Sequence, residues 1–89
     1  MDKKFKEKPF SIGLLLTDGF ALMSYASLIE PLRAANLLKA KELYKITNIA
    51  VQSSRVRSSS GAIIPTKDAT SDIFDLVLII TGGNPQKVE

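Results

Sequence analysis

Glycine and small polar residues follow the most apolar segment of the chain, and their chemistry suits ligand binding. Residues 76–80 read Leu-Val-Leu-Ile-Ile and are followed by Thr81, Gly82, Gly83 and Asn84. An unbroken apolar run that ends in a glycine turn predicts a buried parallel strand. Ligands of open α/β sheets bind beyond the carboxyl ends of such strands, where glycine N–H groups can face them. A tight turn alone would also account for the glycine pair.

A second turn has the same relation to an apolar segment. Thr17, Asp18 and Gly19 follow the apolar residues 10–16, so this turn also lies at the carboxyl end of a predicted strand. We therefore expect the segment from Asp18 to Ser24 to lie opposite the glycine turn, and a ligand to bind between them rather than at the other end of the sheet, near residues 39–45. Turn formation and helix capping are the structural alternatives for Asp18.

Several kinds of chemistry are excluded from this segment. The sequence has no histidine and no cysteine, so it offers no imidazole acid or base, no thiol nucleophile and no disulfide. The glycines match neither the dinucleotide fingerprint nor the P-loop. The carboxylates are scattered without metal-ligand spacing, so we expect no metal site, no catalytic residue and no cofactor.

Composition and charge indicate a globular α/β protein. The chain has 89 residues, 45% of them hydrophobic and 24% charged, with a net charge of +3. Four of its twelve basic residues precede Pro9, and we interpret residues 1–9 as a basic flexible tail and residues 10–89 as a partial α/β domain. The sequence has no stripe of basic residues along a helix, which is the pattern that would predict direct DNA binding. No apolar run reaches the roughly 20 residues of a membrane span, and the first residues lack a signal-peptide core. We expect a cytoplasmic location.

The predicted elements alternate between strand and helix. Their order is a strand over 10–16, a helix from 20 to about 39, a strand over 44–51 nearer the sheet edge, a hairpin of 55–57 and 62–64, one helical turn capped by 70–72 and ending at 74, and the strand 76–80. Leu22, Tyr25, Ile29, Leu32 and Ala35 form the apolar stripe of the helix. A proline follows at position 31, within this helix, and predicts a kink just before it.

This order predicts a Rossmann-like or flavodoxin-like three-layer α/β fold with a mainly parallel sheet and an added β-hairpin. Because the sequence ends shortly after the glycine turn, we expect it to contain the first half of such a domain. An isolated half would leave the last strand without its neighbours and promote self-association. The architecture by itself specifies no function.

Several segments together resemble a known family. They are Ile12 to Leu16, the turn 18–20, the sequence Glu-Pro-Leu-Arg-Ala-Ala-Asn over 30–36, the segment 42–44, and Phe74 to Val77 leading into Gly82 and Gly83. In this order and spacing they resemble the amino-terminal half of the DJ-1/PfpI-like (class I glutamine amidotransferase-like) domain of GlxA-type AraC-family transcriptional regulators. In that family a pair of helix-turn-helix motifs follows the domain.

The resemblance also bears on catalysis. Enzymes of the wider superfamily use a cysteine, which would lie beyond Glu89, assisted by an acid at the start of the first helix. Counted from Gly19, that acidic position is occupied by Ser24, whose neutral hydroxyl cannot stabilise a thiolate by charge. We therefore expect a non-catalytic domain. The resemblance implies backbone N–H groups of Gly82 and Gly83 at the ligand, as in the oxyanion sites of related enzymes.

The candidate ligand-binding residues are Asp18, Gly19, Ser24, Glu30, Gly82, Gly83 and Asn84. For Glu30 a surface ion pair with Arg33, three residues later, is the favoured structural alternative, and pocket contact and dimer contact share the remainder. Asn36 borders the apolar stripe, and we expect it to make hydrogen bonds near the helix end rather than to contact a ligand.

The sequence thus predicts an effector-sensing or dimerisation domain of an AraC-family regulator, with DNA bound through a domain outside this chain. The expected partners are a small amine or amino-acid-like effector and a second copy of the protein. We expect no association with a membrane. The alternatives are a fragment of a DJ-1/PfpI superfamily enzyme (amidase, protease or glyoxalase-like) and a dimerisation module without a ligand.

Overall fold

A computed structural model describes residues 8–82 of the chain. In chain order its elements are β1 (Phe10–Leu16), α1 (Leu22–Lys39), β2 (Tyr44–Ala50), β3 (Arg55–Arg57), β4 (Ile63–Pro65), β5 (Lys67–Asp68) and β6 (Leu76–Ile80). Four strands form a parallel sheet in the order β5-β2-β1-β6, and β3 and β4 form a separate antiparallel hairpin. The predicted mainly parallel α/β fold with an added hairpin is confirmed.

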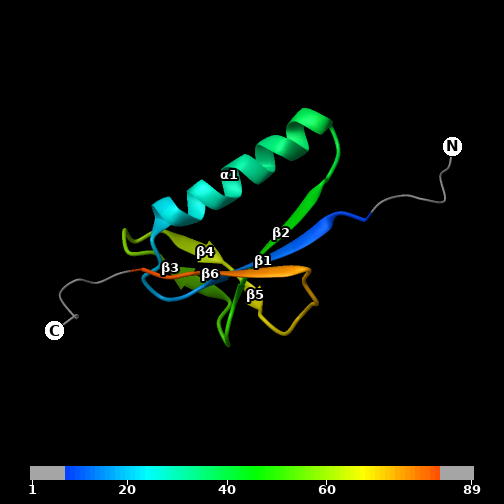
Figure 1. Cartoon of the computed structure of the whole chain (residues 1–89). Helices are drawn as coiled ribbons and strands as arrows, with labels where there is room; N and C mark the ends of the chain where they lie inside the picture. Colours follow the sequence, from blue (N-terminus) through cyan, green and yellow to red (C-terminus); the bar gives the residue numbers. More distant parts are fainter. Residues whose placement is uncertain (1–7, 83–89) are drawn as a thin grey trace, which may run out of the picture.

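The hydrophobic core lies between the sheet and α1, which runs along one face of the sheet (Figure 1). Ile12, Leu14 and Leu16 alternate along β1 and point to this side, as the two-residue period of a strand requires. Four members of the predicted helix stripe pack against this core: Leu22, Tyr25, Ile29 and Leu32. One face of the sheet is thus covered by a helix within residues 8–82, which contain two of the three predicted layers.

The helix α1 continues through Pro31, so the predicted kink does not break it. Its carboxyl end is shaped by Ala40, which adopts a left-handed conformation (φ 53°) and whose N–H caps the last turn. The side-chain oxygen of Asn36 accepts hydrogen bonds from the N–H groups of Leu43 (2.8 Å) and Tyr44 (3.0 Å), and its amide donates to the Tyr44 carbonyl (2.9 Å). The predicted role of Asn36 near the helix end is confirmed, and it determines where β2 begins.

The last strand, β6, is parallel to β1 as predicted, but it is not buried. It pairs with β1 from Leu76 opposite Ile12 to Ile80 opposite Leu16, and it is an edge of the sheet in the described part of the chain. Only Ile80 is buried, whereas the side chain of Ile79 is 63% exposed. The prediction of a buried strand is therefore wrong for residues 8–82, which supply no element to cover it. The expectation that an isolated first half leaves this strand without its neighbours agrees with its edge position.

The predicted helical turn over residues 70–74 is absent, and a short strand and a turn take its place. Lys67 and Asp68 form β5, parallel to the end of β2. The Asp68 carboxylate then accepts hydrogen bonds from the backbone N–H of Thr70 (2.8 Å) and from its hydroxyl (2.7 Å). These bonds, the hydroxyl first, lower the pKa of Asp68 below its ordinary value. Asp68 thus organises an Asx-type turn, which competes with helix formation in this segment.

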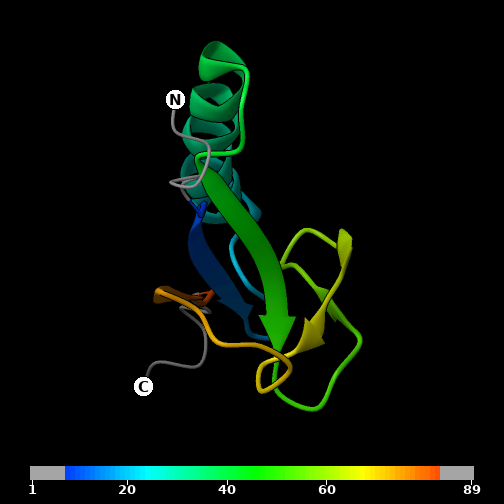
Figure 2. The same ribbon diagram turned by 90° about the vertical axis from the view of Figure 1, so that its right-hand side faces the viewer.

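The hairpin of β3 and β4 lies at the carboxyl end of β2 (Figure 2). Its Val56 is part of the hydrophobic core, and its Ser58 is 2% exposed. The Ser58 hydroxyl oxygen accepts hydrogen bonds from the N–H groups of Ser60 (3.3 Å) and Ala62 (3.0 Å), which closes the hairpin loop. The tail prediction for residues 1–9 falls mostly on residues 1–7, which lie outside the described residues.

Candidate functional site

The turn between β1 and α1 is held by two other segments of the chain, the hairpin of β3 and β4 and the end of β6. Gly19 has a positive φ of 79°, which the turn requires, and its N–H donates to the Arg57 carbonyl of the hairpin (2.8 Å). In return the Ser59 N–H donates to the carbonyl of the fully buried Phe20 (2.9 Å). The hairpin is therefore bonded to the turn from two directions.

The end of β6 is bonded to the same turn. The Thr17 hydroxyl and N–H both donate to the Ile80 carbonyl (3.3 Å each), and the Ala21 N–H donates to the Thr81 carbonyl (3.2 Å). A Cβ placed on Gly82 would lie 1.8 Å from the Gly19 carbonyl oxygen. Glycine is therefore needed at position 82 because two backbones approach closely there. A tight turn alone does not account for this requirement.

The structure brings some of the predicted ligand-binding residues together. Asp18, Gly19 and Gly82 meet at the carboxyl ends of β1 and β6, and Ser24 is exposed near the start of α1. Glu30 lies about two turns further along the helix, where its carboxylate bonds the Arg33 guanidinium (3.0 and 3.1 Å) on the exposed surface. The alternative interpretation of Glu30 as half of a surface ion pair is confirmed. Gly83 and Asn84 lie outside the described residues.

Asp18 is not the helix cap that the sequence allowed. The residue at the N-cap is Ala21, and no side chain caps the helix there. The Asp18 side chain is exposed, and no residue in the range 8–82 donates a hydrogen bond to its carboxylate. Its carboxylate is therefore available to a ligand.

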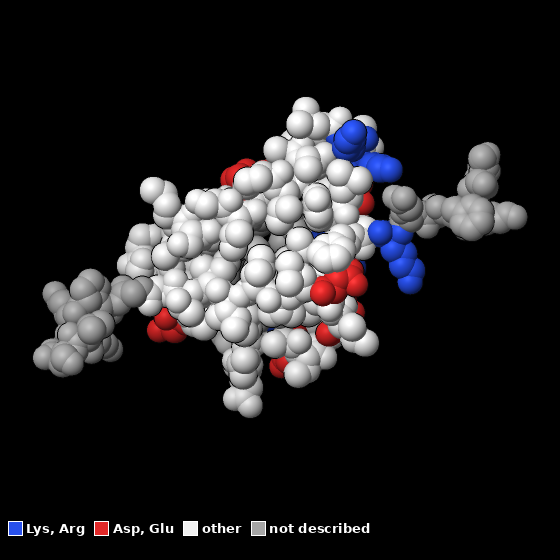
Figure 3. Space-filling model, in the orientation of Figure 1, with Lys and Arg blue, Asp and Glu red and all other residues white. Residues whose placement is uncertain are grey.

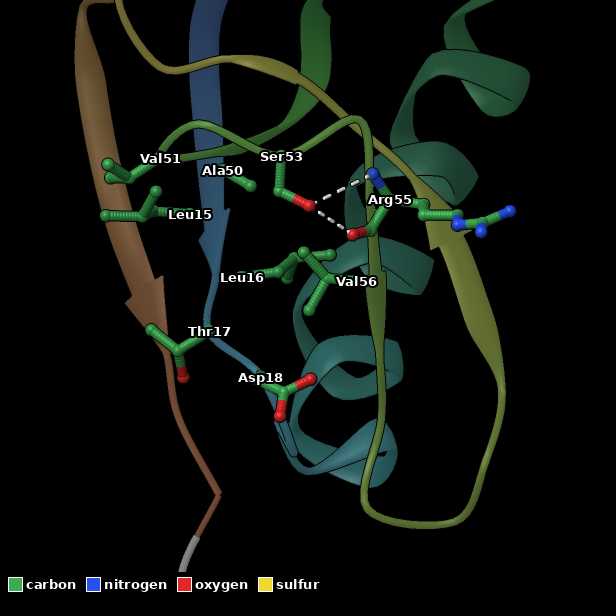
Figure 4. A pocket seen from close by; sticks show the side chains of 9 residues that line it. All are labelled: Leu15, Leu16, Thr17, Asp18, Ala50, Val51, Ser53, Arg55 and Val56. Atoms are coloured by element: carbon green, nitrogen blue, oxygen red, sulfur yellow. Dashed lines mark hydrogen bonds between the residues drawn. The ribbon is translucent and has the colours of Figure 1, made fainter.

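A cavity of about 240 Å³ opens at the carboxyl ends of β1 and β2 (Figure 4). Its walls are apolar on most sides and carry four polar side chains; the lining residues are Leu15, Leu16, Thr17, Asp18, Ala50, Val51, Ser53, Arg55 and Val56. Asp18 is the only predicted site residue among them. The hairpin was predicted from its sequence, but its position against the strand ends depends on backbone bonds that no local pattern reveals.

A second, more open groove of about 410 Å³ runs along β2 between Glu42 and the segment 65–67. It includes Lys45. A groove is therefore also present at the end of the sheet near residues 39–45, where we expected no ligand to bind. Its lining is mostly polar and charged, whereas small-molecule sites are mostly apolar with a few polar groups. The cavity at the strand ends fits that description better.

The charged side chains on one face of the molecule and the possible metal ligands bear on the predictions made from the sequence. Figure 3 shows a face that is mostly uncharged, with basic side chains at its upper right and several acidic side chains lower on the same side. Among residues 8–82, no cluster of three or more potential metal ligands occurs. The described helix is also not apolar enough over its length to cross a membrane.

Two comparisons relate the chain to transcriptional regulators. No protein-family model matches it. It is 47% identical over 76 residues to the HTH-type transcriptional regulator GlxA of Rhizobium meliloti, an alignment of 83% of this chain and 24% of the relative. It is 44% identical over 77 residues to the HTH-type transcriptional regulator GbdR of Pseudomonas aeruginosa, covering 84% of this chain and 21% of the relative. The chain thus spans about a quarter or less of these relatives.

The fold has a counterpart among solved structures. The crystal structure of an AraC family transcriptional regulator from Pseudomonas putida superposes with a TM-score of 0.77, over 85% of this chain and 42% of that chain, at 24% sequence identity. The structure therefore defines an α/β domain of a kind that also occurs in a transcriptional regulator.

Proposed function

We propose that this chain is part of a non-catalytic, effector-sensing or dimerisation domain of a cytoplasmic AraC-family transcriptional regulator. The observation that carries the proposal is the 47% identity to a helix-turn-helix regulator over most of the chain. In this proposal the domain is DJ-1/PfpI-like, residues 10–89 form its first part, and another domain binds DNA. Sensing requires a ligand to change the relative stability of two states of the regulator.

The proposed sensing site lies where the strands end. Asp18 and Gly19 would contact the effector on one side and Gly82, Gly83 and Asn84 on the other, with Ser24 at the start of α1. Support comes from the unengaged carboxylate of Asp18. The contact between Gly82 and the Gly19 carbonyl oxygen holds the two turns together and leaves no room between those two glycines, so the effector would lie beside this contact. Glu30, which bonds Arg33 on the outer surface of α1, is proposed to act at an interface with a second copy.

The absence of catalysis is proposed from Ser24. A carboxylate near a cysteine can shift the thiol pKa by several units, and a neutral hydroxyl lacks that charge. A regulator that senses a metabolite needs the binding site without the reaction. The relatives are described as transcriptional regulators, which agrees with this proposal.

The test uses the full-length protein whose gene encodes this chain. Electrophoretic mobility shift with its own upstream DNA measures binding, with a scrambled sequence of equal length as the control. We expect specific binding that changes when small amines or amino acids are added, and no turnover of amide, glyoxal or peptide substrates.

One outcome would contradict this proposal, and a second would decide between its two forms. Turnover that is lost on replacing a cysteine of the full-length protein would identify an enzyme. Specific DNA binding that no metabolite changes, together with a dimer, would favour a dimerisation module without a ligand. The exposed apolar side chains of β6 are consistent with that second candidate.

A further inference from the structure

The cavity at the ends of β1 and β2 presents hydrogen-bond acceptors. Four polar side chains line it. Three of them, those of Thr17, Asp18 and Ser53, carry oxygen acceptors, and the fourth is the guanidinium of Arg55. The Thr17 hydroxyl donates its proton to the Ile80 carbonyl (3.3 Å), and the Ser53 hydroxyl donates to the Arg55 carbonyl (2.5 Å). The Ser53 oxygen also accepts a bond from the Arg55 N–H (3.4 Å). Because a hydroxyl oxygen has two lone pairs, Ser53 still has one to offer a ligand, and Thr17 accepts no bond within residues 8–82. The Asp18 carboxylate adds acceptors only.

Two ionic side chains line the cavity, those of Asp18 and Arg55. The charge inside the cavity depends on which of them points into it. Figure 4 shows the side chain of Asp18 at one end of the ring of lining residues, whereas the side chain of Arg55 extends away from the other eight. Ser53 bonds the backbone of Arg55 and so fixes the start of the hairpin without engaging the guanidinium. The ionic group available inside the cavity is therefore the carboxylate.

The remaining walls are aliphatic. Leu15, Leu16 and Val56 come from β1 and β3, and Ala50 and Val51 come from the end of β2. Such walls favour a hydrocarbon group, since burying apolar surface stabilises a complex by about 25 cal/mol per Å². A volume of about 240 Å³ is below the usual range for drug-sized ligands, so the ligand must be small.

We propose that this cavity binds a small primary ammonium ion with a short aliphatic chain, and that Asp18 is its counterion. An ammonium group has three N–H donors and no acceptor, which suits the Asp18 carboxylate at one end of the cavity and a wall whose hydroxyl groups already use their protons elsewhere. The aliphatic chain then contacts Leu15, Val51 and Val56. Such a ligand bridges the turn after β1 and the hairpin, which are otherwise joined by the backbone bonds at Gly19 and Phe20. The assignment of a ligand class rests on the proposed sensing function, but the binding itself is tested separately.

The experiment is a ¹H–¹⁵N NMR titration of the full-length protein that contains this chain with n-butylammonium, and with butyrate and n-butanol as the anionic and neutral probes of similar shape. We expect saturable shifts at Thr17, Asp18 and Ser53 with n-butylammonium and none that saturate with the other two. The variant Asp18→Asn keeps the side-chain shape and removes the charge, so its Kd should rise at least tenfold. Asp72→Asn, which neutralises another exposed carboxylate, is the matched control and should leave the Kd unchanged.

Three results would overturn the proposal. One is equal affinity in Asp18→Asn and the unmodified chain; another is tighter binding of butyrate, which would make Arg55 the counterion. The third is a set of shifts that centres on Ser24 and Gly82 instead of Ser53.

The full-length protein separates this proposal from the proposed function. Binding of n-butylammonium that leaves its DNA binding unchanged would sustain the site and refute the sensing role. A response of DNA binding to other metabolites, with no binding of n-butylammonium, would support the sensing role and refute the proposed ammonium site.

Discussion

The strands β1 and β6 are both largely apolar and lie next to each other, yet their surroundings differ. Both are apolar and pair in parallel register. β1 has a strand on each side, and Leu14 is fully buried beneath α1. β6 has β1 on one side, and the side chains of Leu76, Val77 and Ile79 are 42%, 45% and 63% exposed. An apolar run therefore predicts a strand, whereas burial depends on the elements that surround it.

The difference also shows how β6 is kept in place without burial. At its start, the Ser11 N–H donates to the Asp75 carboxylate (2.7 Å) and the Asp75 N–H donates to the Ser11 carbonyl (2.9 Å). At its end, Ile80 and Thr81 accept bonds from the turn after β1. β6 is held by hydrogen bonds along its length and at both ends, whereas β1 is also held by packing. The following predictions test this contrast.

The largest effect is expected from truncation in β1 compared with β6. Leu14→Ala removes a fully buried side chain and should lower the free energy of unfolding by about 2–5 kcal/mol. Ile79→Ala removes an exposed one and should change it by about 0.5 kcal/mol or less. Urea unfolding of the two variants measures both values. Equal costs would show that β6 is buried in solution by another molecule.

The contact between Gly82 and Gly19 should be the next most sensitive. Gly82→Ala places a Cβ 1.8 Å from the Gly19 carbonyl oxygen, so one backbone must move, at a cost of about 1–3 kcal/mol. The amide resonance of Ala21, which donates to Thr81, should shift at the same time. Thr81→Ala, an exposed neighbour, is the control. If both variants unfolded at the same urea concentration, the close approach would be refuted.

On the other side of β1, the start of β2 depends on a single side chain. Asn36→Ala leaves the N–H groups of Leu43 and Tyr44 without the oxygen that accepts them, which should cost about 1–3 kcal/mol. Asn36→Asp keeps that oxygen but places a carboxylate oxygen against the Tyr44 carbonyl in place of the donor, so it should also lower the stability. Chemical denaturation of both variants measures the losses. Unchanged stability in Asn36→Ala would contradict the described bonds.

A smaller effect is expected at the start of β6. Asp75→Ala removes the acceptor of the Ser11 N–H, and because this bond is exposed, the loss should be about 0.5–1.5 kcal/mol. Hydrogen exchange should also become faster at the amide of Ser11. Asp72→Ala removes an acid outside this contact and serves as the comparison. Unchanged exchange in Asp75→Ala would show that the strand ladder alone holds β6.

The smallest effect concerns the opposite edge of the sheet, at β5. The pKa of Asp68 is lowered chiefly by the Thr70 hydroxyl and then by the Thr70 N–H. A lowered pKa in the folded state stabilises the fold above the unfolded pKa, and this contribution is lost as the pH falls through the folded value. An NMR titration should place the Asp68 pKa below 3.8, and Thr70→Val should raise it towards that value. An unchanged pKa in Thr70→Val would exclude the hydroxyl as its cause.

Local interactions explain why so much was predictable from sequence. The strands β1, β2 and β6, the helix and the hairpin follow from periodicity and turn residues. The roles of Asn36 and of the Glu30–Arg33 pair follow from positions on one helix. The helical turn at 70–74 was predicted wrongly because Asp68, two residues before the supposed cap, takes the N–H and hydroxyl of Thr70 for itself.

Tertiary structure decided what the local patterns left open. Thr17 and Ile80 are 63 residues apart, yet their hydrogen bond brings the two candidate turns together. Docking of the hairpin on Gly19 and Phe20 forms the wall of the cavity and adds Ser53 to Asp18. The sequence by itself determined the elements, because each depends on neighbours within a few residues. The burial of β1, the exposure of β6 and the shape of the cavity depend on contacts between distant segments, which exist only once the chain has folded.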